Sequence, residues 1–343
     1  MHILLAPDSF KESLSAKQVA EALKKGFQEA LPDATFDLLP IGDGGEGTME
    51  TLARVLNVTE YQTQVTGPFG QPVLMSYYQK DEMAFFELAS LVGLGSIPAE
   101  KRNPLELETR GIGELILQLV DQGVKTICVG IGGSATNDGG IGMAAGLGVA
   151  FYDDQGHLLR PVGASLGRVA RIDTSAVPKA LEDIDLQVLT DVTNPLCGSQ
   201  GATYVFGGQK GLNPLLFPAV DQAMKDFYQL VDARILSMAG AGAGGGMAAG
   251  LVAFAGGQIS SGIEKSLDLI DFDRKVQKAD LVVVGEGRMD LQSLSRKAPV
   301  GVAKRTSDKI PVLAICGSLA DDLPAFPSHH IEAAFSIVPG PCK

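Results

Sequence analysis

The sequence is poor in positive charge, and its cysteine and histidine residues form no recognisable pattern. It has 28 Lys and Arg against 40 Asp and Glu, a net charge of −12, which argues against nucleic acid or an anionic membrane surface as a partner. The four cysteines are scattered without a CxxC pair, which is typical of a reduced, cytoplasmic protein. The four histidines form no HxxxH pair, so a histidine-based metal site is not indicated. None of this excludes a small anionic ligand, because a few local cations and backbone N–H groups can hold one.

Several common site motifs are missing or stand in the wrong context. There is no GxxxxGK[ST], which disfavours a P-loop nucleotide fold. The stretch GAGAGG (240–245) fits GxGxxG, but it follows a helical pattern rather than a strand, which argues against a dinucleotide site. The stretch GASLG (163–167) fits the GxSxG of hydrolases, and a triad at Ser165 could draw on His157, His329 or His330. A poor strand pattern before this stretch disfavours the hydrolase, which is kept as an alternative.

From the sequence we expect neither a leader nor a membrane span. Its start, MHILLAPDSFKESLSA, lacks the basic segment and long apolar core of a signal peptide. The stretch Ile235–Ile263 carries no charge, but glycine-rich segments interrupt it on both sides of a short apolar run. We therefore expect a buried helix between loops there rather than a membrane span.

Short apolar runs alternate with helical patterns at both ends of the chain. The runs are of strand length, at 2–8, 34–43, 279–287, 310–317 and 333–339. Helical spacing of apolar residues follows at 13–31, where Ser13 or Ser15 could cap the helix, and at 44–56 and 299–307. Continuous apolar strands that alternate with helices predict a doubly wound parallel sheet in an α/β protein.

The middle of the chain has a different pattern. Residues 62–89 predict strands linked by a hairpin with a GPFG turn, followed by a helix at 109–122 and strands at 125–133 and 185–192. A chain of 343 residues suggests two domains. We expect a discontinuous domain of residues 1–60 plus 271–343, and an inserted mixed α/β domain of residues 61–270.

Two nearly identical stretches of small residues recur 104 residues apart. They are GMAAGLGVAF, from Gly142, and GMAAGLVAF, from Gly246. Their flanks do not match, so no tandem repeat is indicated. Small residues let helix backbones approach closely, and we expect two helices that pack tightly.

Five loops that follow predicted strands are rich in acidic residues and hydroxyl side chains, and three of them also contain glycines. They are APDSFKES (6–13), PIGDGGEGT (40–48), GIGGSATNDGG (130–140), LTDVTNP (189–195) and VGEGRMDLQSLSRKAP (284–299). In open α/β sheets, ligands bind beyond the carboxyl ends of the strands, where glycines leave backbone N–H groups free to contact an anion. The acidic residues, Asp138 among them, suit Mg²⁺ or general-base duty. Together these loops indicate phosphoryl transfer.

The same loops, with FSIVPGPC near the end, resemble the type I glycerate kinase family of bacteria, and the resemblance runs over the whole chain. It implies two α/β domains, one flavodoxin-like and one inserted, with the active site between them. It also implies ATP-dependent, Mg²⁺-assisted phosphorylation of D-glycerate, with 2-phosphoglycerate favoured over 3-phosphoglycerate. Small-molecule substrates and a possible homodimer follow as expectations. A binding or regulatory relative without turnover is the other alternative.

On this resemblance we assign roles to individual residues as hypotheses. Asp43 or Asp191 accepts the proton of the glycerate hydroxyl, while Lys11 and Arg288 contribute positive charge. The residues expected to bind the nucleotide are Gly132, Gly133, Ser134, Asn137, Asp8, Ser9, Glu286 and Lys297. Asp290 is the candidate ligand of Mg²⁺. Two departures stand out: Arg296 replaces the usual glycine before Lys297, and the usual helix after PGPC has no counterpart before Lys343.

Overall fold

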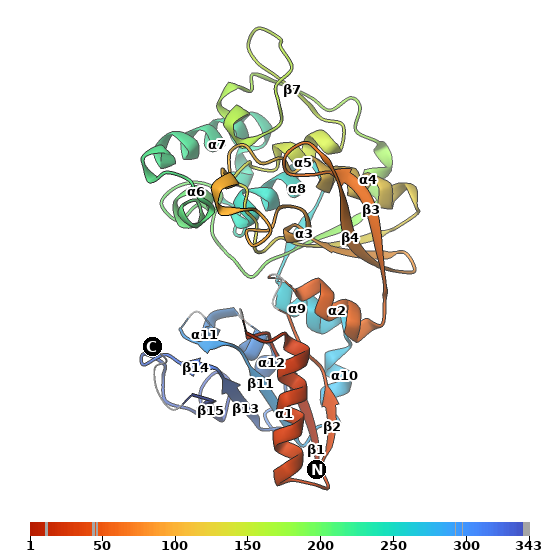
Figure 1. Cartoon of the computed structure of the whole chain (residues 1–343), viewed down its shortest axis with the longest axis vertical. Coiled ribbons are helices and arrows are strands. Elements are labelled where there is room, and N and C mark those ends of the chain that lie inside the picture. The colour runs from red at the N-terminus through yellow and green to blue at the C-terminus, as the bar shows by residue number, and fades with distance from the viewer. Residues whose placement is uncertain (11–12, 43–44, 46, 292, 297, 339–343) are drawn as a thin grey trace. The chain divides into compact units, whose positions relative to one another are not determined.

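The computed structural model describes residues 1–10, 13–42, 45, 47–291, 293–296 and 298–338, with the backbone alone described at 295 and 296. The chain divides into two compact units (Figure 1). Unit 1 comprises residues 1–57 and 261–343, and unit 2 comprises residues 58–260. Each unit is built on its own sheet, and the segment that forms unit 2 is inserted into unit 1.

Unit 1 contains a five-stranded parallel sheet in the order β15-β13-β11-β1-β2. Read from β2, this is the 2-1-3-4-5 order of flavodoxin-like folds, so the predicted doubly wound sheet is confirmed. The elements of unit 1 are β1 His2–Pro7, α1 Ala16–Ala30, β2 Thr35–Leu38, α2 Thr48–Leu56, α9 Gly262–Leu269, α10 Phe272–Val276, β11 Leu281–Gly285, β12 Arg288–Met289, α11 Ser293–Arg296, α12 Ala298–Arg305, β13 Val312–Cys316, β14 Ser318–Leu319 and β15 Ala333–Ser336.

The central strands of unit 1 are buried on both faces. All five residues of β11 are buried, as are Ile3–Pro7 of β1, which explains their uninterrupted apolar sequence. Helix α1 covers one face through Leu23 and Phe27, which pack on the cluster around Ile3 and Leu5. Ser15 caps α1 in a capping box with Gln18, as one of the two serines was predicted to do.

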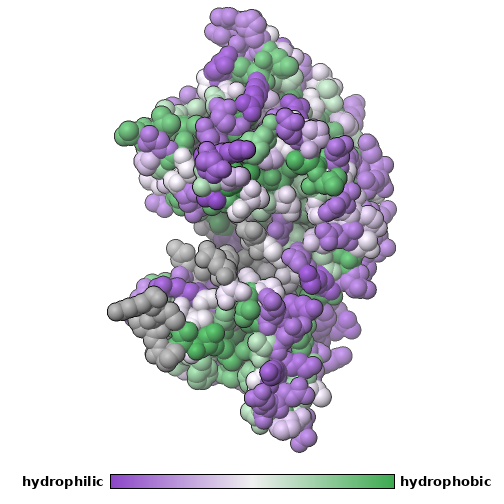
Figure 2. All heavy atoms as spheres, viewed as in Figure 1, coloured by the Kyte–Doolittle hydropathy of each residue, from purple (hydrophilic) through white to green (hydrophobic). Residues whose placement is uncertain are grey.

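An apolar cavity of about 450 Å³ lies beside α1 in unit 1. Its lining includes Phe10, Leu23, Phe27, Ile315 and Ile337. Hydrophobic atoms are visible on this part of unit 1 in the space-filling view (Figure 2). A lining without charged side chains does not suit a phosphorylated ligand, so this cavity is not the candidate site.

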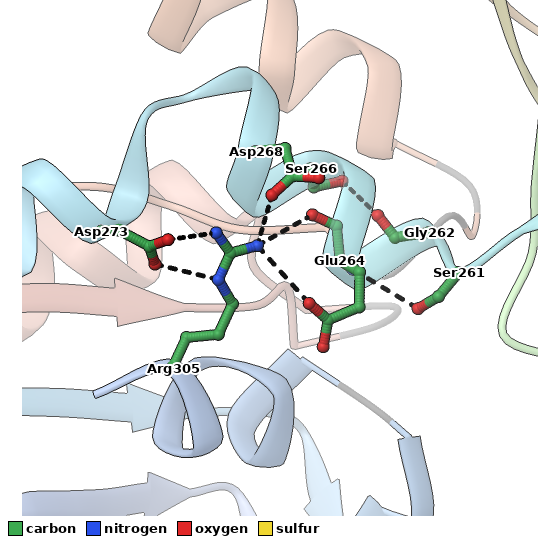
Figure 3. Close-up of polar contacts among 7 residues, drawn as sticks. All are labelled: Ser261, Gly262, Glu264, Ser266, Asp268, Asp273 and Arg305. Carbon is green, nitrogen blue, oxygen red and sulfur yellow. Dashed lines mark hydrogen bonds and ion pairs between the residues drawn. The ribbon is translucent and has the colours of Figure 1, made fainter. Parts of the chain in front are cut away.

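Helices α9, α10 and α12 are tied together by one guanidinium group (Figure 3). Arg305 donates two hydrogen bonds to Asp273, at 2.9 and 2.6 Å, and a third to Asp268 at 2.5 Å. The hydrogen bond from Arg305 is the main reason that the pKa of Asp273 lies below its usual value. Helix α9 also packs on α12, because a Cβ atom on Gly301 would lie only 2.3 Å from Ile263. For this reason α9 belongs to unit 1, although the sequence pattern places it in the inserted domain.

Unit 2 contains a six-stranded mixed sheet in the order β10-β9-β6-β5-β4-β3. Strands β10, β9, β6 and β5 are parallel, and β5, β4 and β3 are antiparallel, so the predicted mixed sheet and hairpin are confirmed. The strands of unit 2 are β3 Thr59–Thr66, β4 Pro72–Lys80, β5 Met83–Glu87, β6 Thr126–Gly130, β7 Ala150–Tyr152, β8 Arg171–Asp173, β9 Asp185–Leu189 and β10 Gln258–Ser260.

Most of the helices of unit 2 are short. The α-helices are α3 Ala89–Val92, α4 Arg110–Asp121, α5 Ile141–Gly146, α6 Ala202–Phe206, α7 Phe217–Val231 and α8 Met247–Ala255. The 3₁₀ helices are η1 Ala99–Lys101, η2 Gly163–Arg168, η3 Lys179–Asp183, η4 Gly208–Lys210, η5 Pro214–Leu216, η6 Ala233–Ser237 and η7 Ala243–Gly245. Within the described ranges, no helix has both the length and the apolar composition to cross a membrane.

The two small-residue stretches become α5 and α8, and these helices pack on each other. A Cβ atom on Gly250 would lie 2.8 Å from the Cα atom of Gly140, and one on Gly246 equally close to the Cα atom of Gly139. The predicted tight packing is therefore confirmed. Helix α8 also confirms the buried helix expected within Ile235–Ile263, since its apolar residues are largely enclosed.

Candidate functional site

The strand order of the unit 1 sheet reverses at the boundary between β1 and β11. Loops that leave neighbouring strands on either side of such a switch point run to opposite faces, which opens a crevice at the carboxyl end of the sheet. Asp8 and Ser9 follow β1, and Glu286 follows β11. The N–H of Asp8 donates to the carbonyl of Gly285 at 2.8 Å, so these two loops start side by side. The structure thus brings together three residues that the sequence predicts to bind a nucleotide.

A polar cavity of about 680 Å³ adjoins the loop after β1. It is lined by residues of the β1 and β2 loops and of α1 and α2, including Asp8, Ser9, Pro40, Gly42 and Arg54. The guanidinium of Arg54 is 2.6 Å from the carboxylate of Glu50 on the same helix. A cavity of this size with both charged and backbone polar groups is suited to a small polar ligand.

The loops after β11 and β13 run together because two glycines allow it. A Cβ atom on Gly285 would lie 2.1 Å from the carbonyl oxygen of Ile315, and one on Gly317 would lie 2.3 Å from that of Gly287. The N–H of Gly317 donates to the carbonyl of Glu286 at 3.0 Å, and β12 then pairs with β14. Arg288 is thereby held on β12 with its side chain exposed.

Asp290 lies three residues before the first residue of helix α11 and bonds to that residue. Its Oδ1 accepts a hydrogen bond from the N–H of Ser293 at 3.0 Å, and the Oγ of Ser293 accepts one from the N–H of Asp290 at 3.0 Å. One oxygen of this carboxylate is therefore engaged by the residue at which α11 begins. Among the described residues, no group of three or more His, Cys, Asp or Glu side chains could hold a metal ion. A Mg²⁺ role for Asp290 stays a prediction.

The loop after β6 in unit 2 has unused backbone donors. The N–H groups of Gly132, Gly133 and Ser134 have no acceptor within the part of the chain that the structure describes. The loop is nevertheless fixed, because the N–H of Leu94 donates to the carbonyl of Gly133 at 2.8 Å and that of Ala135 to Val92 at 2.7 Å. Gly133 has a φ of 69°, in the left-handed region. Successive free N–H groups around a left-handed residue form a nest, which binds anions.

Asp191 lies at the same edge of the sheet as this nest. Strands β6 and β9 are parallel neighbours, and Gly130 pairs with Leu189. Asp191 therefore follows its strand by two residues, as Gly132 follows the adjacent one, and its side chain is half-buried. The base role of Asp191 and the phosphate-binding role of this loop stay predictions.

Two polar residues farther along the same loop point into the interior. Asn137 is fully buried and donates from Nδ2 to the Oγ1 of Thr203 at 3.0 Å. Asp138 is also fully buried and accepts from the Oγ1 of Thr109 at 2.6 Å and from the N–H of Gly140 at 3.1 Å. Burial raises the pKa of Asp138, and these hydrogen bonds act in the opposite direction. Asp138 thus fixes the start of α5, whereas the sequence suggested a metal or general-base role.

Lys210 is the polar residue of this region that the sequence analysis missed. It is 3% exposed, and its Nζ donates to the Oγ of Ser134 at 2.9 Å and to the carbonyl of Thr136 at 2.7 Å. Burial lowers the pKa of Lys210 to about 7, although the nearby Asp138 acts to raise it. The only signal in the sequence is a single lysine inside the glycine-rich stretch GGQKG, which matches no motif considered.

The hydrolase and dinucleotide motifs do not have the required context. Ser165 is buried within the 3₁₀ helix η2, so it does not lie on a strand-to-helix elbow. The imidazole of His157 pairs with Asp153 at 3.3 Å. The GAGAGG stretch follows the 3₁₀ helix η6, and a Cβ on its Gly245 would lie 2.0 Å from the carbonyl oxygen of Thr136. These glycines serve backbone packing.

Three of the predicted site residues, Lys11, Asp43 and Lys297, lie outside the described residues. Their assignments stay predictions. Cys128, Cys197 and Cys316 are free thiols, in keeping with the scattered cysteines of the sequence.

Unit 1 has a flavodoxin-like sheet with a topological switch point, and unit 2 has a mixed sheet that bears an anion nest. This architecture is suited to phosphotransfer. The family model for the glycerate kinase family matches residues 3–343, and the chain belongs to this family. The family places it among the kinases, which transfer a phosphoryl group to an alcohol.

Its relatives match over nearly the whole chain. A glycerate kinase of Neisseria meningitidis is 58% identical over 338 residues, which cover 98% of this chain and 91% of the relative. The glycerate 2-kinase of Escherichia coli is 42% identical, with 98% and 91% covered. A crystal structure from Salmonella typhimurium LT2, described as a candidate glycerate kinase 2, matches with a TM-score of 0.85 and 42% identity over 98% of this chain and 90% of that one.

Proposed function

We propose that this protein phosphorylates D-glycerate with ATP and Mg²⁺ and that the product is 2-phosphoglycerate. The observation that carries the proposal is the run of free N–H groups at Gly132, Gly133 and Ser134, in a chain that belongs to the glycerate kinase family. The glycerate 2-kinase of Escherichia coli supports the choice of product.

Phosphoryl transfer depends on positioning and charge neutralisation more than on covalent chemistry. The N–H groups of the nest would donate to phosphate oxygens of ATP, since they need no rearrangement to accept an anion. The backbone of this loop is anchored to residues 92–94, so the donors are preorganised.

Acid–base chemistry and further positive charge would come from side chains. Asp191 is our candidate to accept the proton of the attacking hydroxyl, with Asp43 as the alternative. Arg288 is exposed and would bind a carboxylate or phosphate through its planar guanidinium. Asp8 and Ser9 line the polar cavity beside β1, Glu286 begins the loop after β11, and all three remain candidates for binding the nucleotide.

Bound Mg²⁺ would supply charge neutralisation for the phosphates, and Asp290 is the residue that we expect to hold it. Mg²⁺ commonly takes only one or two protein carboxylates beside phosphate and water, so a single half-buried carboxylate such as Asp290 fits this role. The hydrogen bond from the N–H of Ser293 holds that carboxylate in place.

The test is to incubate the protein with Mg-ATP and D-glycerate and to identify the product by phosphorus NMR. 2-Phosphoglycerate would establish both the reaction and the hydroxyl that reacts. 3-Phosphoglycerate would keep the kinase but refute the position. ATP binding without any phosphorylated product would instead favour the regulatory alternative.

A further inference from the structure

The mechanism proposed above does not use Lys210, although its ammonium group is the most deeply buried cation near the nest. Lysine is almost never fully buried without partners that compensate for lost hydration. Here the side chain is 3% exposed, and both of its described hydrogen bonds go to the loop after β6.

The two acceptors lie at one end of the nest. The Oγ of Ser134 belongs to the last residue of the nest, and the carbonyl of Thr136 comes two residues later. Between them, Ala135 donates its N–H to the carbonyl of Val92. The loop is therefore held from one side by the backbone of residues 92–94 and from the other by the side chain of Lys210.

Among the described residues, one charged group acts on the ammonium of Lys210. The carboxyl group of Asp138 is the charged group that acts on it, and Tyr228 of α7, whose hydroxyl donates to the carbonyl of Gly139 at 2.7 Å, interacts with the same Asp138. An anion bound by the N–H groups of Gly132–Ser134 would bring further negative charge to the loop that Lys210 contacts. Because little water shields these groups, the attraction would favour the charged ammonium.

We propose that Lys210 is a positioning residue for phosphate binding, which acts by holding Ser134 and Thr136 so that the N–H groups of the nest stay aligned. The inference rests on the proposed function, in which the nest binds the phosphates of ATP. It assigns Lys210 no contact with the reacting atoms.

The test compares Lys210→Met, Ser134→Ala and the double variant with the wild type. Lys179→Met, an exposed lysine of the same unit, is the matched control. Mg-ATP binding is measured by calorimetry, KM for each substrate and kcat by a coupled assay, and folding by thermal unfolding. We expect Lys210→Met to raise both Kd and KM for ATP at least about tenfold and KM for glycerate less than about threefold. Ser134→Ala should raise the same ATP constants by a smaller factor, and the double variant should be no worse than Lys210→Met.

A purely structural role for Lys210 would give a different pattern. The proposal fails if Lys210→Met lowers the melting temperature but leaves the ATP constants of the folded protein unchanged, or if it raises both KM values equally. If Lys210→Met does not fold, Ser134→Ala decides, because it removes one acceptor and leaves the lysine in place; unchanged ATP constants in that variant overturn the proposal. A wild type that binds ATP without phosphorylating glycerate refutes the proposed reaction. In that case the Kd values for ATP of the wild type and the variants still test the role of Lys210. A wild type that does not bind ATP overturns the role of Lys210.

Discussion

The ammonium nitrogen of Lys210 lies 2.9 Å from the hydroxyl oxygen of Ser134, although 76 residues separate them in the chain. The contact joins η4 to the loop after β6, which are otherwise distinct segments of unit 2. It places a cation whose pKa is lowered to about 7 directly beside the candidate anion nest.

The first prediction concerns the left-handed glycine of the nest. Gly133→Ala places a Cβ at a φ of 69°, which costs about 1–2 kcal/mol and shifts the backbone N–H groups. We expect KM for ATP to rise about tenfold or more, as measured by steady-state kinetics. Gly156→Ala is the matched control, because Gly156 has a φ of 83° and a Cβ atom there would have nothing within 4 Å. Equal effects of the two variants on KM would contradict the nest.

The second prediction tests the general base. Asp191→Asn keeps the shape of the side chain but cannot accept a proton, and general bases commonly contribute about 10²–10⁴-fold to rate. We expect kcat to fall by at least about 10²-fold with little change in KM for ATP. Asp154→Asn, at an exposed position of the same unit, should retain full turnover. Wild-type turnover in Asp191→Asn would shift the assignment to Asp43.

The third prediction concerns stability and pH. The unfolded chain keeps the Lys210 proton up to about pH 10.5, whereas the folded protein releases it near pH 7. Between these values the unfolded state binds more protons, so the contribution of Lys210 to the free energy of unfolding rises with pH, by at most about 1.4 kcal/mol per unit. Below pH 7 Lys210 is charged in both states, so the unfavourable free energy of burying its charge lowers the free energy of unfolding in full.

This dependence can be isolated by subtraction. Denaturant unfolding of the wild type and Lys210→Met would be compared from pH 6.5 to 9, since other titrating groups are common to both proteins. We expect the wild type to gain stability relative to the variant as the pH rises. A constant difference would show that the pKa of Lys210 is not lowered.

The fourth prediction concerns the contact between α5 and α8. Gly250→Ala would bring a Cβ to 2.8 Å from the Cα of Gly140, and overpacking of this kind costs about 1–3 kcal/mol. We expect a corresponding loss in the free energy of unfolding. Gly95→Ala, where a Cβ has open space within the same unit, should be close to neutral. A neutral Gly250→Ala would mean that the helices can separate without cost.

The fifth prediction concerns the guanidinium that joins three helices of unit 1. Arg305→Met removes the hydrogen bonds to Asp268 and Asp273, and we expect a loss of about 1–3 kcal/mol in unfolding free energy. Arg274→Met is the control, because Arg274 makes a single exposed pair with Asp271, and such pairs contribute little. The measurement is chemical unfolding of each variant, and similar losses in both would argue against a special role for Arg305.

The sequence predicted the strands of both sheets except β10, which it placed in a glycine-rich loop segment, because buried strands have recognisable apolar runs. Residues 281–285 are apolar without interruption, as expected for a parallel strand covered on both faces. Five loops at the carboxyl ends of strands were predicted for a similar reason, since acidic and hydroxyl residues, with glycine in three of the loops, follow those strands.

Side-chain direction within those loops could not be predicted in the same way. Ser134 and Asn137 look like exposed phosphate ligands in the sequence, yet both side chains are buried, Ser134 bonded to Lys210 and Asn137 to Thr203. The sequence did not predict a role for Lys210 in this region, because a lysine is normally exposed. Its burial depends on partners 74 and 76 residues away, which only the fold brings near.

The insertion of unit 2 into unit 1 sets an order of events during synthesis. Ile3 of β1 pairs with Leu281 of β11, so the first strand must wait for nearly the entire remaining chain before its sheet can form. Unit 2 is complete once Ser260 has been made, and it can fold while β1, which can pair with β2, still lacks its other neighbour β11. Contacts of such sequence separation form slowly, and until they do the edge of β1 that β11 will occupy stays open to other chains. The part of the protein that is synthesised first is therefore the part that is finished last.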